Sequence, residues 1–242
     1  WEEKLGETFL TSDTVFDLPD LPESVAVIGT GAVGLELAQA FSRLGVAVTA
    51  FNRENRVAGL NDADINAKAI DCLSEDLTMH LKSTINEIGH KIDTDGKTAA
   101  FIEYTDKDGN EGRWQGERVL VATGRRNNIE QLGVENLGVE LDDKNRPKNL
   151  DKHTGQIGDL DVYIVGDANA NIPLLHVASD EGYSAGSIVC NQNTDAYIRP
   201  VAIPFSIVFT SPQIVNVGMT QQEIEDDPDL EYVIGKVSFD NQ

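Results

Sequence analysis

The sequence contains few cysteines, and they are not spaced for joint chemistry. Cys72 and Cys190 are the only two, and neither a C-x-x-C nor a C-x-x-x-x-C pattern occurs. This excludes a redox dithiol or a zinc clip made of neighbouring cysteines within these residues. We predict that both cysteines are buried and behave as small apolar side chains.

Long apolar runs and basic residues are also scarce. No run approaches the roughly 18 uncharged apolar residues of a membrane helix, and the N-terminal WEEKLGETFL lacks the features of a signal peptide. We therefore expect a cytoplasmic protein. With 19 basic and 41 acidic residues, the formal charge is -22. This charge disfavours nucleic acid and membranes as partners, and it is typical both of an ordinary solvated surface and of a salty habitat.

The length and composition are those of a folded protein. The chain has 242 residues, is 40% apolar and contains no internal repeat or low-complexity tract. It is long enough for one large core, or for one complete domain and part of another. Residues 1–24 are polar, contain two prolines and show no sustained period. They are typical of a linker that leads into a first strand.

A strand-helix-strand unit follows this segment. Ser24–Gly29 is an apolar run of the length of a buried parallel strand, and Val46–Phe51 is a second one. Between them, apolar residues recur at helical spacing, and Gly45 lies where a helix C-cap glycine belongs. The apolar stripe consists of Val33, Leu37, Ala40, Phe41 and Leu44. The pattern predicts a βαβ crossover.

The remaining elements are predicted from the same kinds of pattern. Helices are predicted at Asp62–Ser74, with Asp62 as N-cap, and at His176–Val189. A hairpin with an Asp-Gly turn is predicted from Thr98 to Trp114. Other strands are predicted at Leu77–Leu81, Arg118–Ala122, Val162–Val165 and within the run FSIVF, whereas residues 127–161 are predicted to be mostly loop.

The glycine-rich turn between the first strand and its helix is the strongest functional signal. Gly29-Thr30-Gly31-Ala32-Val33-Gly34 has the pattern G-x-G-x-x-G. The first glycine permits a tight turn, the second allows a pyrophosphate to approach the backbone, and the third allows close packing of helix on strand. The phosphates would lie on free N–H groups at a helix N-terminus. A purely structural turn is the alternative, and we favour dinucleotide binding.

The end of the second strand lacks the acidic residue that is typical of NAD sites. Asn52 and Arg53 stand there instead. Asn52 cannot repel a 2′-phosphate, and Arg53 and Arg56 can pair with one, which slightly favours NADP over NAD. Two alternatives stay open at this point. Both arginines can simply face water, and Glu54 can still reach the ribose.

Several separated stretches resemble the flavin-dependent pyridine nucleotide-disulfide oxidoreductases, most closely their dihydrolipoamide dehydrogenase branch. In chain order these stretches are SDTVFDLPDLPESVAVIGTGAVGLELA, VLVATGRR, VYIVGDANANIPLLHVASDEG, AGSIV and IPFSIVFTSPQIVNVGMTQQE. The resemblance implies an α/β protein. It would have a Rossmann-like nucleotide-binding domain with a central parallel sheet and a β-meander, a partial FAD-domain segment and a truncated α+β interface domain.

The resemblance also assigns roles to residues of the nucleotide site. Residues 29–34 match the family's pyrophosphate turn, and Glu36 matches a glutamate that lies toward the nicotinamide. Gly124 matches a glycine that lines the same groove. The alternative for Glu36 is an ordinary exposed helix residue, and the alternative for Gly124 is an ordinary glycine at the end of a strand.

A second set of residues resembles the family's flavin site. Gly166-Asp167 matches a motif whose aspartate accepts a hydrogen bond from the ribityl chain of FAD, although Asp167 can also simply cap its own loop. The segment Pro173, Leu174, Leu175 and His176 matches residues that approach the flavin ring through their backbone. We assign no proton transfer to His176, no catalytic residue and no metal ligand.

Parts of the family pattern do not occur in this sequence. The first FAD turn, the C-x-x-x-x-C dithiol and the histidine-glutamate pair of the interface domain have no match. We therefore interpret the chain as an internal piece of a longer protein. Its expected divisions are a connector (1–21), an NAD(P)-binding domain (22–145), a second FAD-domain segment (146–197) and the start of an interface domain (198–242). We expect this piece to bind NAD(P), to bind FAD weakly or not at all, and to catalyse nothing.

The resemblance implies that the parent protein is a homodimeric enzyme. It would pass hydride between NAD(P) and FAD, and electrons to a disulfide such as a lipoyl group. Other possible activities are reduction of glutathione disulfide or mercuric ion, and dithiol-less transhydrogenation. A non-enzymatic nucleotide-binding module is the alternative from another class. The disulfide substrate is not determined by these residues.

Overall fold

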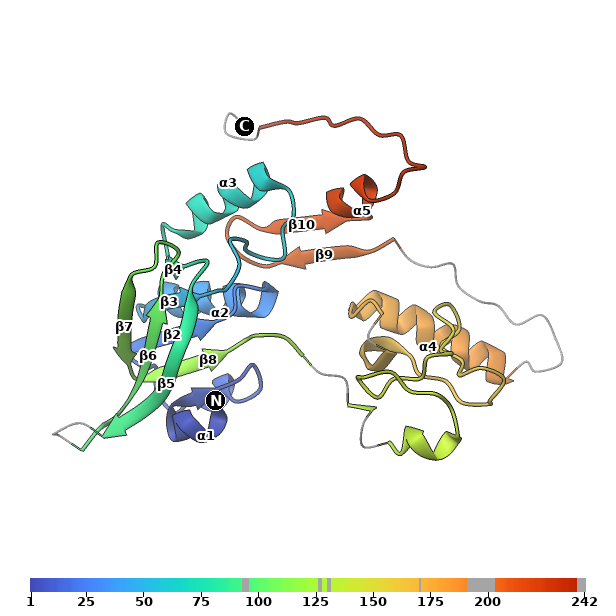
Figure 1. Cartoon of the computed structure of the whole chain (residues 1–242), viewed down its shortest axis with the longest axis horizontal. Helices are drawn as coiled ribbons and strands as arrows, with labels where there is room; N and C mark the ends of the chain where they lie inside the picture. Colours follow the sequence, from blue (N-terminus) through green and yellow to red (C-terminus); the bar gives the residue numbers. More distant parts are fainter. Residues whose placement is uncertain (93–95, 126–127, 130–131, 170, 191–202, 239–242) are drawn as a thin grey trace. The chain divides into compact units, whose positions relative to one another are not determined.

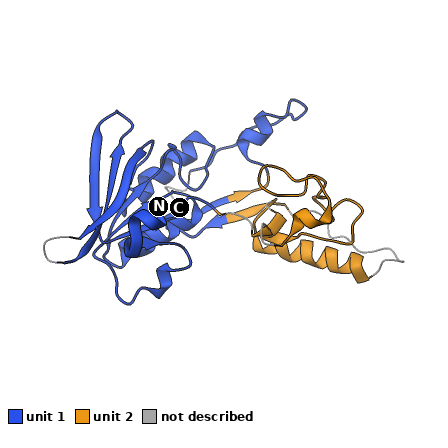
Figure 2. Ribbon diagram, turned by 60° about the horizontal axis from the view of Figure 1, so that its bottom comes forward, with its two compact units in different colours: residues 1–124, 207–215, 219–242 blue, residues 125–206, 216–218 orange. Residues whose placement is uncertain are grey.

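A computed structural model describes residues 1–92, 96–125, 128–129, 132–169, 171–190 and 203–238 (Figure 1). The chain divides into two compact units (Figure 2). The first consists of Trp1–Gly124, Ile207–Val215 and Met219–Gln242, and the second of Arg125–Ser206 and Asn216–Gly218. The expected domain division remains a prediction, and its boundary at residues 197 and 198 lies outside the described residues.

A parallel sheet of five strands forms the centre of the first unit. Its strand order is β1-β8-β2-β3-β4, and every neighbouring pair is parallel. The strands are β1 (Phe9–Leu10), β2 (Ser24–Ile28), β3 (Ala47–Phe51), β4 (Thr78–His80) and β8 (Arg118–Val121). The predicted α/β class with a central parallel sheet is therefore confirmed.

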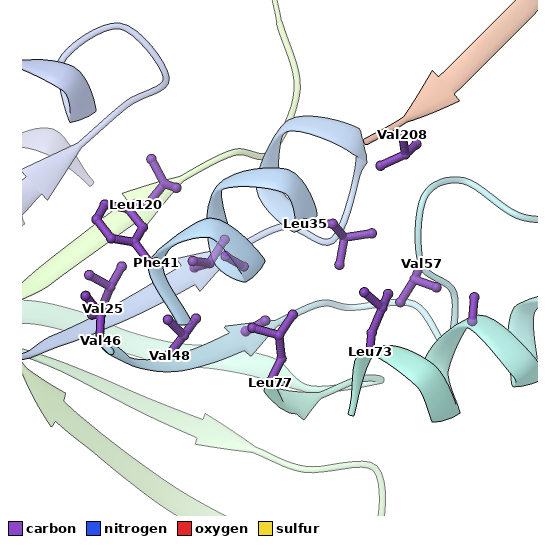
Figure 3. Packing of buried hydrophobic residues seen from close by; sticks show 14 of the residues in the cluster. Val25, Leu35, Phe41, Val46, Val48, Val57, Leu73, Leu77, Leu120 and Val208 are labelled. Atoms are coloured by element: carbon purple, nitrogen blue, oxygen red, sulfur yellow. The ribbon is translucent and has the colours of Figure 1, made fainter. Parts of the chain in front are cut away.

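Both faces of the central strand β2 are buried, which explains its unbroken apolar sequence. Val25 and Val27 join a cluster that packs under the helices α2 (Ala32–Arg43) and α3 (Ala63–Leu73) (Figure 3). Ala26 and Ile28 point to the opposite face and join a second cluster. Successive residues of a strand point to opposite faces, so β2 anchors both halves of the core.

The second cluster lies under an antiparallel meander of the strands β5 (Thr84–Ile92), β6 (Thr98–Thr105) and β7 (Glu111–Gly116). The strands β6 and β7 form the predicted hairpin, whereas β5 was not predicted. Only Ile88 and Gly89 of β5 are buried, so its sequence shows little alternation. The meander carries Ile88, Ala100 and Ile102 into the core.

Helix α2 confirms the helix predicted after the glycine turn, but its buried face differs from the predicted stripe. The residues that it buries are Gly34, Leu35, Ala38, Gln39 and Phe41. Leu44 is 62% exposed, because the helix ends at Arg43 and the chain turns through Gly45 at a φ of 91°.

Helix α3 also confirms its prediction, including the N-cap. The Asp62 carboxylate accepts hydrogen bonds from the backbone N–H groups of Asp64 and Ile65, at 2.9 and 2.8 Å. These bonds satisfy donors that have no partner within the first turn. The helix therefore starts where the sequence predicts.

The second unit contains little regular structure. Its elements are the short helices η4 (Val134–Leu137) and η5 (Gly166–Asn169) and the longer α4 (Leu175–Cys190). A small core gathers Ile129, Val134, Ile157 and Ile164. The hairpin of β9 (Phe205–Val208) and β10 (Ile214–Val217) has residues in both units, and α5 (Gln221–Glu225) follows it.

Three predictions from the sequence are corrected by the structure. The linker at residues 1–24 instead contains α1 (Glu2–Leu5), η1 (Gly6–Thr8), β1 and η2 (Val15–Asp17), because Leu5 and Leu10 are buried in the two cores. The strand predicted at Val162–Val165 does not form, since its only ladder contact in the described residues is a single bridge between Gln156 and Tyr163. Cys72 is half-buried and Cys190 is exposed, so neither cysteine is a core residue.

None of the helices in the described residues combines the length and the apolar character that a membrane crossing requires.

Candidate functional site

The glycine turn connects β2 to α2 at the carboxyl edge of the parallel sheet. Gly29 has a φ of 105°, and its N–H donates to the carbonyl of Phe51 at the end of β3 at 2.8 Å. Gly31 is the N-cap of α2, no side chain caps this end, and the first turn contains no acidic residue. The first N–H groups of a helix carry partial positive charge, so this end suits an anion.

The three glycines have different steric roles. A Cβ atom on Gly29 would lie 2.4 Å from the carbonyl oxygen of Ala122, and one on Gly34 would lie 2.1 Å from the carbonyl oxygen of Gly29. The fold therefore requires glycine at both positions. At Gly31, by contrast, the described residues beyond its immediate neighbours in the chain leave open space around the added Cβ, and φ is -74°. The turn requires glycine at positions 29 and 34, whereas at Gly31 only the mild preference of an N-cap for glycine over alanine applies.

Thr30 ties the turn to the loop after β3. Its hydroxyl donates to the carbonyl of Arg56 at 3.0 Å, and its own carbonyl accepts from the N–H of Ala58 at 2.8 Å. Asn52 donates its side-chain amide to the same Arg56 carbonyl at 3.0 Å. The structure therefore brings together the turn and Asn52, which the sequence predicts to bind one nucleotide.

The two arginines of this loop lie in different surroundings. Arg53 is exposed, and no ion pair to it is found among the described residues. Arg56 is paired with the carboxylate of Glu54 and donates from Nη1 to the Asn61 side chain at 2.7 Å. The sequence alone left open whether these arginines meet a phosphate. The structure shows that one of them already contacts a carboxylate.

Glu36 is also engaged within the chain. Its carboxylate accepts a hydrogen bond from the backbone N–H of Phe209 at 2.8 Å. It is therefore more than an ordinary exposed helix residue. Gly124 lies just after β8 with a φ of 120°, which favours glycine whether or not a ligand binds. The predicted ligand roles of both residues stay predictions.

An aromatic cluster lies at the ends of β3 and β4. The ring of His80 stacks on Phe51 at 5.2 Å, and its Nε2 lies 3.3 Å from the Tyr104 hydroxyl. Burial lowers the pKa of His80 below its ordinary value of 6.5, and the charge of Asp106 opposes this shift. Because the backbone carbonyl of His80 accepts from the N–H of Asn52, the cluster adjoins the predicted ribose end of the site.

The predicted flavin residues lie in the second unit. Gly166 begins η5 with a φ of 65°, and a Cβ there would lie 3.1 Å from the Ala178 side chain. Asp167 is 56% exposed and lies 3.8 Å from the Arg125 guanidinium. Pro173, Leu175 and His176 are exposed around the start of α4, and Leu174 is half-buried. An accessible carboxylate that accepts hydrogen bonds fits a polyhydroxyl chain, so these residues are compatible with a flavin.

Glu181 is a residue of this region that the sequence analysis did not identify. It is 9% exposed, and one of its carboxylate oxygens accepts from the Gly166 N–H at 2.6 Å and from the Asn169 side chain at 2.8 Å. It therefore fixes the turn that carries Asp167. Its spacing with Val177, Ser184 and Ala185 on one helix face is the signal that could have revealed its burial.

The described residues contain no group of three or more His, Cys, Asp or Glu side chains arranged to hold a metal ion.

Comparisons with known proteins connect this geometry to a family. The family described as "Pyridine nucleotide-disulphide oxidoreductase" matches residues 2–182 of the chain. A mitochondrial dihydrolipoyl dehydrogenase of Dictyostelium discoideum is 30% identical over 234 residues, which are 96% of this chain and 46% of that protein. A mercuric reductase of Staphylococcus aureus is 32% identical over 221 residues, 90% of this chain and 38% of that protein.

Solved structures share the fold. LpdA from Mycobacterium tuberculosis superimposes with a TM-score of 0.69 at 26% identity, covering 89% of this chain and 44% of that one. The flavoprotein disulfide reductase RclA from Escherichia coli superimposes with a TM-score of 0.74 at 19% identity, covering 91% of this chain and 48% of that one. The chain thus spans less than half the length of these proteins.

Proposed function

Because the chain belongs to the pyridine nucleotide-disulphide oxidoreductase family, we propose that its glycine turn binds the diphosphate of NAD(H) or NADP(H). The N–H groups at the start of α2 would donate to the phosphate oxygens, and the helix dipole would favour their negative charge. The positive field at this helix end offsets the repulsion that a chain with a formal charge of -22 exerts on an anionic ligand. The observation that carries the proposal is the open space at Gly31, which leaves room for a phosphate at the start of α2.

The proposed activity of the whole protein is that of a flavin-dependent oxidoreductase similar to dihydrolipoyl dehydrogenase. FAD would be held by Gly166, Asp167 and the segment from Pro173 to His176. When bound, it supplies two-electron redox chemistry. Asp167 would accept hydrogen bonds from the ribityl hydroxyls, and Glu181 would keep the turn in place. The similarity to a mercuric reductase favours metal-ion reduction as a second candidate. A homodimeric parent and a cytoplasmic location stay predictions.

Calorimetric titration of the 242-residue protein with NADH and with NADPH tests nucleotide binding. We expect the wild-type chain to bind at least one of them. Gly31→Ala should keep the fold and lose at most about 1 kcal/mol of stability, since alanine is a poorer N-cap than glycine. Its affinity for the nucleotide should fall at least about tenfold, because the added methyl group occupies the approach to the phosphates.

Gly182→Ala is the matched control, since Gly182 lies in α4 and the described residues outside its own helix turn leave open space around an added Cβ. This variant should keep the wild-type affinity. If Gly31→Ala binds both nucleotides as tightly as Gly182→Ala does, the turn does not hold a diphosphate.

A further inference from the structure

Glu54 and Arg56 form a charged pair in the loop between β3 and α3. The Glu54 carboxylate contacts Nε of Arg56, and both side chains are about half exposed. The Nη1 group of Arg56 donates at 2.7 Å to the side chain of Asn61. The guanidinium therefore has an anionic and a neutral partner from its own loop.

This pair adjoins the glycine turn. The carbonyl of Arg56 accepts one hydrogen bond from Thr30 of the turn and another from Asn52 at the end of β3, both at 3.0 Å. In a dinucleotide-binding βαβ unit, the adenosine ribose lies beyond the end of the second strand. The charges of Glu54 and Arg56 are thus placed close to the position where NAD carries a 2′-hydroxyl and NADP a 2′-phosphate.

The side chain of Arg56 lines a cavity of about 540 Å³ together with Asn61, Asn66 and Ile70. Glu54 also lines this cavity, whereas the glycine turn, Asn52 and Arg53 are not among the residues that line it. Glu54 and Asn61 therefore hold the guanidinium within its own loop. A 2′-phosphate, with roughly two negative charges, would have to displace the Glu54 carboxylate to reach Arg56. It would then lie beside that carboxylate, which repels it.

We propose that Glu54 determines the nucleotide preference of this site and directs it toward NAD(H). The proposal rests on the proposed nucleotide-binding function and deepens it. Glu54 would favour NAD(H) over NADP(H) in two ways. Its carboxylate pairs with Arg56, and it would repel the 2′-phosphate of NADP(H). It would thereby replace the carboxylate that is missing at Asn52. Arg53, which is exposed next to Glu54, is the cation whose attraction for a phosphate Glu54 offsets.

Binding of NADH and NADPH to the 242-residue protein, measured by calorimetry at low ionic strength, tests this proposal. The wild-type chain should bind NADH at least about fivefold more tightly than NADPH. Glu54→Gln should raise the affinity for NADPH about tenfold and change that for NADH less than about twofold. Adding Arg56→Gln to Glu54→Gln should remove most of the gain, because the released guanidinium is the group that binds the phosphate.

Glu111→Gln is the matched control, since Glu111 is exposed on β7 and its loss changes the net charge equally. This variant should alter both affinities alike and only slightly. The proposal is overturned if the wild-type chain prefers NADPH, or if Glu54→Gln raises both affinities by the same factor. If neither nucleotide binds to the wild-type chain, the proposed function itself fails, which is a distinct result.

Discussion

The side-chain amide of Gln39 pairs with the peptide group of Ser211. Its Oε1 accepts from the Ser211 N–H at 2.7 Å, and its Nε2 donates to the Ser211 carbonyl at 3.0 Å and to Asp76 at 2.8 Å. Gln39 is only 3% exposed. Together with the hydrogen bond from Phe209 to Glu36, this pairing holds residues 209–211 against α2.

Replacing Gln39 should therefore destabilise the first unit. Gln39→Leu keeps much of the side-chain volume but leaves the Ser211 peptide group without its partners, which costs about 1–3 kcal/mol. Urea denaturation measures the loss. Gln115→Leu is the control, because Gln115 is exposed on β7 and its replacement should change stability by less than about 0.5 kcal/mol. Equal stability of the two variants would contradict this interpretation of the pairing.

Glu181 should determine the conformation of the turn at Gly166. Glu181→Leu removes the acceptor of two buried donors and should cost about 1–3 kcal/mol of local stability. The Gly166 amide hydrogen should then exchange with solvent at least about tenfold faster, as measured by NMR. Glu181→Gln retains an acceptor oxygen and should restore most of the protection. Unchanged Gly166 exchange in Glu181→Leu would show that the carboxylate does not hold the turn.

His80 should make stability depend on pH. Because its pKa is lowered in the folded protein, the unfolded chain binds a proton on this ring more readily. The stabilisation is complete above the ordinary value of 6.5 and is lost as the pH falls toward the lower pKa of the folded state. Tyr104 and Asp106 are the titratable groups that face the ring.

The comparison of wild type with His80→Phe measures this effect. Phenylalanine keeps the stacking on Phe51 but cannot be protonated. Between about pH 7.5 and about pH 5.5, the wild-type protein should lose more stability in urea denaturation than the variant does. Carboxylates titrate in both proteins, so only the difference is informative. An identical loss in both would exclude His80 as the source.

Helical spacing, a capping residue and continuous apolar runs were enough to predict several helices and strands from the sequence. The helices α2 and α3 have helical spacing, α3 also has the capping residue Asp62, and β2 is a continuous apolar run. The strand predicted at Val162–Val165 was wrong because a strand forms only when a neighbour pairs with it, and the described residues offer one bridge. The strand β5 was missed because most of its residues are exposed, so it shows little alternation.

The candidate site was predictable to a similar extent. The G-x-G-x-x-G pattern located the turn. Only the surroundings of the three glycines show that the backbone requires Gly29 and Gly34, whereas Gly31 leaves room for a ligand. The partners of Arg56 and Glu181 depend on how loops and helices pack. A sequence shows that a charged residue is present, whereas its neighbours in space decide whether it is available to a ligand.

The order of the central sheet also bears on how the protein is synthesised. The strand β8 lies between β1 and β2 and pairs with both, although it comes after the whole meander in the chain. On the ribosome, β1 must therefore wait for β8 to leave the exit tunnel before it can pair, whereas β2 can pair with β3 earlier. The meander needs only neighbouring strands, so it can assemble earlier, and contacts close in sequence form fastest.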